Sequence, residues 1–157
     1  MGNRLYLETT IISYLAARLS RDLVVAAHQQ LTHEWWDNHR HGFDLFSSQL
    51  VEREAAAGDE IVARKRLRLL SDTVTLDATA ESQALTKELL GLEALPENAS
   101  DDAAHIAIAT VHGMDYLLTW NCRHIANARL HRAIKRASSN LGFELPIICT
   151  PEELIGA

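Results

Sequence analysis

The chain has 157 residues and a formal net charge of −6, with 47% hydrophobic and 23% charged residues. This length and composition fit one globular domain with its own core, and no apolar run reaches the roughly 18–20 residues that a membrane-spanning helix needs. The first residues do not form a secretion signal, and two cysteines are too few for a disulfide scaffold. We therefore expect a single cytoplasmic domain over residues 1–157 with no membrane partner.

The acidic excess is unevenly distributed along the chain. Residues 41–100 carry six basic and eleven acidic side chains, whereas residues 116–143 carry five basic side chains and no acidic one. The net charge argues against a strong non-specific binder of duplex DNA, whose affinity depends on neutralising phosphates. With the basic stretch at 116–143, the chain can nevertheless present a basic surface.

Short apolar runs alternate with helical patterns. In chain order they predict a strand at 4–8, a helix from Thr9 or Thr10 to Leu15, a helix at 22–40, a strand at 43–46, a helix from Ser47 or Ser48 to 57, a helix at 59–70, a strand at 73–76, helices at 78–91 and 100–113, a strand at 116–119, a helix at 124–138 and a strand at 147–149. Asp22, Asp59 and Ser100 are the expected N-caps of three of these helices. This alternation is typical of an α/β fold with a parallel sheet covered on both faces.

Polar side chains follow the ends of several predicted strands, where open parallel sheets bind ligands. Glu8 ends the first strand, Glu54 lies in the helix after the second, Asp102 opens the apolar helix and Asn121 follows the strand at 116–119. Each has an ordinary structural alternative: Glu8 as a charge at a helix N-terminus, Glu54 as a solvated side chain, Asp102 as a first-turn acid and Asn121 as a turn residue.

Asp102 favours a functional interpretation because it shares a helix face with Ile106 and Ala109, which belong to the predicted core. Partly buried carboxylates are costly unless they are paired or bind a metal ion. A group of Glu and Asp oxygens suits a hard ion such as Mg²⁺ or Mn²⁺, and such ions activate water for attack on phosphorus.

The chain resembles PIN-domain ribonucleases of the VapC-like type II toxin family over essentially its whole length, and three segments carry the resemblance. They are YLETTIISYL, SSQLVEREAAAGD and DDAAHIAIATVHGMDYLLTWNCRHIAN. Counting six residues from Ser48 places the second acid of the family on Glu54, and counting three residues back from His105 selects Asp102 over Asp101. The fourth acidic position of the family falls on Asn121.

The resemblance implies a three-layer α/β/α fold with strand order 3-2-1-4-5, a site for Mg²⁺ or Mn²⁺, and cleavage of RNA. Its catalytic and metal-binding residues would be Glu8, Glu54, Asp102 and Asn121, with the hydroxyls of Thr9 and Thr119 orienting water or carboxylates. It also implies a small antitoxin partner and a homodimer that forms through the helices after the first strand.

Two positions depart from the family pattern. Glu8 stands where the family most often has Asp, and Asn121 replaces a carboxylate by a neutral amide. These departures leave open an alternative, a catalytically weakened PIN-like protein that acts as a binding or regulatory subunit.

The remaining candidates have weaker claims. We expect His105 to be a core histidine hydrogen-bonded to a carbonyl, and Trp120 to be a packing residue. His124 has a weak claim to phosphate binding. Two basic groups, at 64–68 and 123–136, are either solvated helix surfaces or a track for a nucleic-acid backbone.

Overall fold

A five-stranded parallel sheet forms the centre of the computed structural model, which describes residues 2–91 and 95–156. Its strands are β1 (Asn3–Leu7), β2 (Phe43–Ser48), β3 (Val74–Leu76), β4 (Tyr116–Leu118) and β5 (Ile147–Cys149). They lie in the order β3-β2-β1-β4-β5, and each neighbouring pair is parallel. The order 3-2-1-4-5 implied by the resemblance is therefore confirmed.

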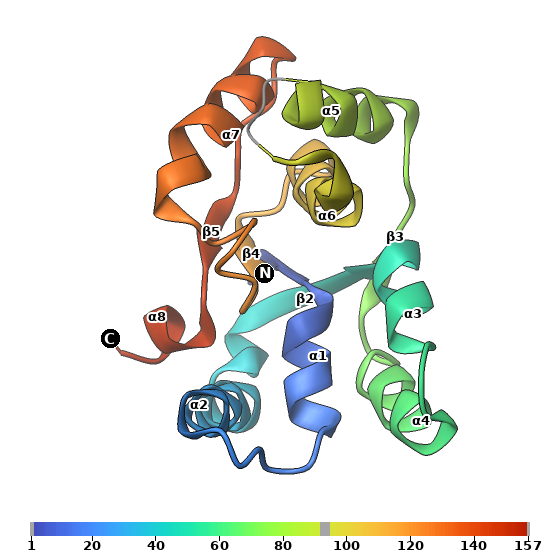
Figure 1. Ribbon diagram of the computed structural model, residues 1–157, viewed down its shortest axis with the longest axis vertical. Coiled ribbons are helices and arrows are strands. Elements are labelled where there is room, and N and C mark those ends of the chain that lie inside the picture. The colour runs from blue at the N-terminus through green and yellow to red at the C-terminus, as the bar shows by residue number, and fades with distance from the viewer. Residues whose placement is uncertain (1, 92–94, 157) are drawn as a thin grey trace.

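Helices cover both faces of this sheet. Figure 1 shows α1 (Thr9–Ala16), α2 (Leu23–Asn38), α3 (Gln49–Ala55) and α4 (Glu60–Leu69) on one side, and α5 (Ala80–Gly91), α6 (Ser100–Val111) and α7 (Ala128–Asn140) on the other. A short α8 (Pro151–Ile155) follows β5, and 3-10 turns occur at Arg40–Gly42 and Glu97–Ala99. The result is the expected three-layer α/β/α architecture.

The core is densest around β1 and α6. Leu5, Tyr6 and Leu7 of the central strand are fully buried, because β1 has a strand on each side and helices on both faces. α6 lies between the sheet and α5, and this position explains why its sequence is apolar nearly all round. The polar residues at the start of α6 are thereby brought to the edge of the sheet where β1 ends.

Three predicted helix starts are confirmed. Asp22, Ser48 and Asp59 cap α2, α3 and α4, each accepting a hydrogen bond from a backbone N–H of the first turn.

Several other starts differ from the prediction. The N-cap of α1 is Glu8 rather than a threonine, and Ser100 is the first residue of α6 and not its cap. α7 begins at Ala128 instead of residue 124, because residues 121–126 form a turn closed by backbone hydrogen bonds to the Asn121 carbonyl.

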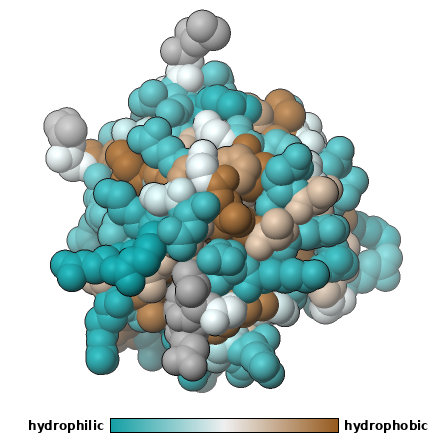
Figure 2. All heavy atoms as spheres, turned by 90° about the horizontal axis from the view of Figure 1, so that it is seen from above, coloured by the Kyte–Doolittle hydropathy of each residue, from teal (hydrophilic) through white to brown (hydrophobic). Residues whose placement is uncertain are grey.

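Hydrophilic side chains cover most of the face shown in Figure 2, with apolar atoms reaching it in small patches. Within the described part of the chain, no helix combines the length and the apolar character that a membrane crossing requires.

Candidate metal centre

Glu8 directly follows β1, where β2 and β4 lie on opposite sides of the strand and the strand order reverses. Its side chain is only 4% exposed. Oε1 accepts hydrogen bonds from the hydroxyls of Thr10 and Thr119, each at 2.6 Å, and Oε2 accepts from the backbone N–H of Thr10 at 3.1 Å. All three donors are neutral, and among the described residues Glu8 makes no ion pair. A buried carboxylate held this way still calls for a counter-charge.

Glu54 comes from the last turn of α3 and faces Glu8 from the β2 side of the sheet. Its Oε1 accepts a hydrogen bond from the Thr9 hydroxyl at 2.6 Å and lies 2.6 Å from Nε2 of His105. Burial works to raise the pKa of the Glu54 carboxyl, but the hydrogen bond and charge of His105, helped by Thr9, outweigh it. The pKa is therefore lowered, which favours the carboxylate form.

His105 belongs to the same group and is buried, as expected, but the expected carbonyl partner is wrong. The imidazole lies between two side chains: Nε2 contacts Glu54, and Nδ1 lies 2.7 Å from the hydroxyl of Tyr6. The Tyr6 hydroxyl in turn lies 2.9 Å from Ser48 Oγ, the N-cap of α3. A chain of hydrogen bonds thus links the N-terminus of α3 to the carboxylate in its last turn.

Asp102 lies one helical turn before His105 on α6 and forms a contact of its own. Its Oδ2 is 2.8 Å from Nδ1 of His124, and its side chain is 26% exposed. Asp101, by contrast, is 62% exposed and lies 3.9 Å from Arg53 at the surface. The carboxylate chosen by counting from His105 is thus the one of the two that faces inward.

Asn121 serves the turn that follows β4. Its Oδ1 accepts a hydrogen bond from the backbone N–H of His124 at 3.0 Å, the local role that its turn alternative described. Its own N–H donates to Thr119 Oγ1, the hydroxyl that donates to Glu8. Asn121 is therefore connected to Glu8 through hydrogen bonds to the Thr119 hydroxyl, and to Asp102 through hydrogen bonds to His124.

The turn is fixed to the site from a second direction. The backbone N–H of Trp120 donates to Thr10 Oγ1, which donates to Glu8, and the buried indole donates to Thr32 and stacks on His28 with ring centroids 4.0 Å apart. Trp120 is a packing residue, as expected. The hydroxyls of Thr9 and Thr119 hold Glu54 and Glu8, so both orient carboxylates as the sequence suggested.

The structure divides the sequence-predicted site into two neighbouring groups. Glu8 and Glu54 come together with His105, each offering one donor atom within 4.8 Å of the others. Asp102 and Asn121 lie beside this group, joined through His124. The role of His105 was missed because no sequence spacing links a histidine on α6 to a glutamate fifty-one residues earlier. Only its position one turn after Asp102 placed it near the site.

An open hollow of about 690 Å³ lies next to the Asp102 group. Its lining is partly polar, with Glu97, Arg123, His124, Asn127 and Arg129, and partly apolar, with Leu90, Leu95, Pro96 and Leu130. His124 thus borders this hollow and contacts Asp102 at once. Two arginines and a histidine give it the character of a phosphate-binding surface.

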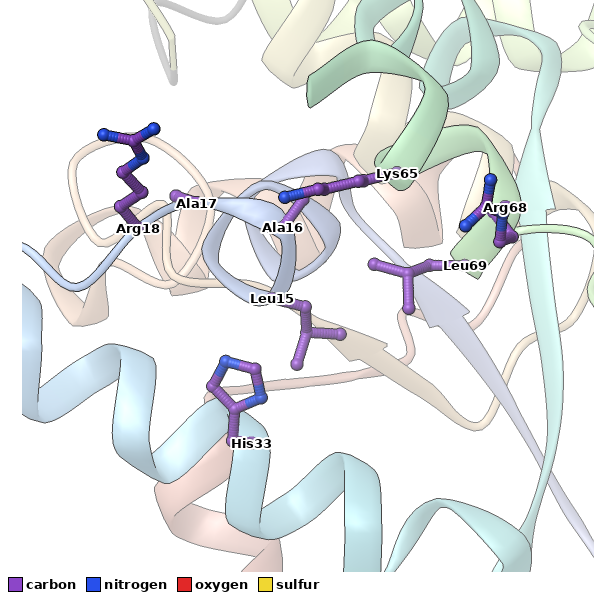
Figure 3. Close-up of a pocket in the computed structure, with 8 residues that line it drawn as sticks. All are labelled: Leu15, Ala16, Ala17, Arg18, His33, Lys65, Arg68 and Leu69. Atoms are coloured by element: carbon purple, nitrogen blue, oxygen red, sulfur yellow. The ribbon is translucent and has the colours of Figure 1, made fainter. Parts of the chain in front are cut away.

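A second hollow of about 500 Å³ lies between α1, α2 and α4 and contains none of the predicted site residues. Figure 3 shows Leu15 and Leu69 at its apolar part, with Arg18, His33, Lys65 and Arg68 around it. The basic group at 64–68 therefore lines a surface of its own.

Comparison with known proteins supports the fold. No protein-family model matches the chain. A chain in the crystal structure of VapBC2 from Rickettsia felis, bound to a DNA fragment from their promoter, superimposes with a TM-score of 0.58 and 15% identity, covering 93% of this chain and 97% of that one. The sequence is 29% identical over 128 residues to the ATP-dependent RNA helicase mak5 of Aspergillus oryzae. That match covers 72% of this chain, which spans less than a fifth of the helicase, since the aligned part is 17% of its length.

These findings define the fold class. A parallel sheet in the order 3-2-1-4-5, helices on both faces and the structural likeness to a VapBC2 chain together show a PIN-like fold. The resemblance that the three sequence segments carry is thus confirmed at the level of the fold.

Proposed function

We propose that the protein is a divalent-metal-dependent ribonuclease that hydrolyses RNA phosphodiester bonds. The observation that carries the proposal is the convergence of Glu8 and Glu54 where β1 ends, with donor atoms of the group within 4.8 Å of one another. Glu8 is buried and held by neutral hydroxyl and amide donors, so a bound cation would supply the missing counter-charge.

The residues fit a divalent ion such as Mg²⁺ or Mn²⁺. Glu8 and Glu54 would hold it, with Asp102 and Asn121 as further oxygen ligands at the side of His124. The hydrogen bond to His124 uses Oδ2 of Asp102 and leaves Oδ1 without a partner among the described residues. When bound, the ion would activate water and stabilise charge on phosphate oxygens.

The chain's own residues then have separate tasks. The hydroxyls of Thr9, Thr10 and Thr119 fix the carboxylates, so that little reorganisation is needed when an ion binds. Arg123 and Arg129 in the adjoining hollow would hold the phosphates on either side of the cleaved bond. The acidic residues would thus hold the metal ion, and the neighbouring basic residues would hold the negatively charged RNA backbone.

The test is cleavage of a mixed RNA pool in the presence of Mn²⁺, with EDTA as the control. Asp102→Asn should abolish cleavage and change the Tm in metal-free buffer by no more than about 2 °C, because Asn still accepts a hydrogen bond from His124. Unimpaired cleavage by this variant would exclude the proposed mechanism.

A second candidate function is that of a PIN-like binding or regulatory subunit without catalysis. Two expected metal ligands already have hydrogen-bond partners within the protein, which favours this function. Asn121 Oδ1 closes a turn, and Asp102 is paired with His124. Calorimetric titration separates the two functions. Absence of heat with Mn²⁺ at millimolar concentration would support the subunit.

We further propose that the protein is the toxin of a type II toxin–antitoxin pair. The similar structure is that of VapBC2. The basic and partly apolar hollow between α1, α2 and α4 has the charge to receive an acidic segment of a small antitoxin. Expression with the product of a small neighbouring open reading frame should yield a stable complex that has lost RNA cleavage.

A further inference from the structure

His105 has the surroundings of a metal ligand. The imidazole is 1% exposed, and its Nε2 is one of the three donor atoms that lie within 4.8 Å of one another. Ions of the first transition row bind oxygen and nitrogen donors at about 2.0–2.2 Å, which puts neighbouring donor atoms on one ion about 3 Å apart. Nε2 of His105 lies 2.6 Å from Oε1 of Glu54, and all three donor atoms lie within 4.8 Å of one another, so a small adjustment of the side chains would let one ion contact all three residues.

The far side of the ring is fixed as well. Nδ1 lies 2.7 Å from the hydroxyl of Tyr6, which is fully buried and fixed by Ser48. Burial strongly raises the pKa of Tyr6, so its hydroxyl stays neutral and can accept a hydrogen bond from Nδ1–H while donating to Ser48. Metal-binding histidines almost always donate their second ring N–H to an oxygen acceptor, most often a carboxylate, a backbone carbonyl or water, which fixes both tautomer and ring orientation. The Tyr6 hydroxyl oxygen occupies that position here.

The charges of the group also favour an ion. Glu8 and Glu54 bring two carboxylates together, and among the described residues neither is within ion-pair distance of a lysine or arginine. Two carboxylates brought this close repel each other, and a cation between them removes that repulsion. Nε2 of His105 and Oε1 of Glu54 are hydrogen-bonded at 2.6 Å, and a metal ion bound to both atoms would take the place of the proton in that hydrogen bond.

We propose that Nε2 of His105 is a direct metal ligand together with Glu8 and Glu54, and that the site takes a first-row transition ion such as Mn²⁺ or Fe²⁺ in preference to Mg²⁺. The inference rests on the metal site of the proposed function but not on RNA cleavage. Imidazole nitrogen binds transition ions well, whereas Mg²⁺ prefers an octahedral shell of oxygen atoms. In the bound form Nδ1 carries the ring proton and donates it to the Tyr6 hydroxyl.

The test is pulsed electron paramagnetic resonance of the whole protein loaded with one equivalent of Mn²⁺. A directly bound imidazole nitrogen gives a ¹⁴N coupling to the manganese electron spin, and an all-oxygen site gives none. We expect the coupling in the unchanged protein and its loss in His105→Gln. The matched control is His124→Gln, which removes the other histidine near the site and should keep the coupling.

A second variant protects the test if His105→Gln does not fold. Tyr6→Phe removes the partner of Nδ1 and keeps the ligand, so the ¹⁴N coupling should remain while the affinity for Mn²⁺ falls by about tenfold or more. In a folded His105→Gln variant, the ratio of Mn²⁺ to Mg²⁺ affinity should fall by a similar factor.

The outcomes separate this inference from the proposed function. Mn²⁺ binding without ¹⁴N coupling, or coupling lost only in His124→Gln, would overturn the role of His105 even if RNA is cleaved. Coupling from His105 in a protein that cleaves no RNA would leave the inference in place and remove the ribonuclease proposal. Failure of the protein to bind Mn²⁺ at millimolar concentration would overturn both.

Discussion

At the scale of single residues, Glu8 is the carboxylate whose environment most needs a cation. It caps α1 and is held by two threonine hydroxyls, yet it is buried without a positively charged partner among the described residues. Burying the Glu8 charge lowers the stability of the metal-free protein, and the same buried charge strengthens the binding of a cation. The two effects can be measured separately.

Glu8→Gln should abolish the rise in Tm that Mn²⁺ produces and leave the metal-free Tm unchanged or higher by about 2–4 °C, because the variant buries no charge. Thermal unfolding with and without Mn²⁺ checks this. The control is Glu144→Gln, an exposed carboxylate, which should keep the full metal-induced rise. A metal-free protein strongly destabilised by Glu8→Gln would show that the charge is structural.

Glu54 gives a prediction about pH. Because its folded-state pKa lies below the ordinary value of 4.5, the carboxylate contributes stability that is complete above that value and is lost as the pH falls through the lowered pKa. In metal-free buffer, the unchanged protein should therefore lose more stability between about pH 5 and pH 3 than Glu54→Gln does. Urea unfolding at several pH values measures this difference, and identical pH profiles would contradict it.

At the level of the elements, the sequence predicted every strand of the sheet and the N-caps of α2, α3 and α4, because these depend on local patterns of apolar residues and caps. The cap of α1 was missed, since glutamate is not among the side chains that usually cap helices. The start of α7 was placed too early, because the turn before it is closed by backbone hydrogen bonds to the Asn121 carbonyl, and such bonds leave no pattern in the side chains. The pairing of His105 with Glu54 depends on how α3 and α6 meet across the sheet, which no local pattern records.

The position of α7 leads to a prediction about RNA binding. Arg129 lines the hollow beside His124, whereas Arg136, on the same helix, does not. Arg129→Glu should weaken RNA binding and lower the slope of log affinity against log salt by about one, as expected for a lost phosphate contact. Arg136→Glu makes the same change of charge and should have a much smaller effect. Equal losses in both variants would mean that only the total charge matters.

The connection between α1 and α2, together with the first turn of α2, is where the expected homodimer would form. Leu19, Leu23 and Val24 are 67%, 86% and 64% exposed there, as an apolar contact surface would be in a separate subunit. Leu23→Asp should convert a dimer to a monomer in light scattering coupled to size exclusion. Leu141→Asp, an exposed position after α7, should leave the mass unchanged. A monomeric unchanged protein would refute the dimer.

At the scale of the whole molecule, the net charge of −6 has a different meaning from the one it first suggested. Some of the acidic side chains converge where β1 ends and form the proposed metal centre. The basic residues Arg123 and Arg129 lie in a hollow next to that centre, while those at 64–68 lie mainly on α4. Folding brings acidic residues from distant parts of the sequence together at one site and basic residues together beside it, although the chain as a whole is acidic.

Both proposals depend on the binding of a divalent ion at the end of β1. The most direct measurement is an anomalous difference map from crystals soaked in Mn²⁺. We expect one strong peak in contact with Glu8, Glu54 and His105, with Asp102 at its side. Soaked crystals with no peak there, or with peaks only at surface histidines, would contradict it.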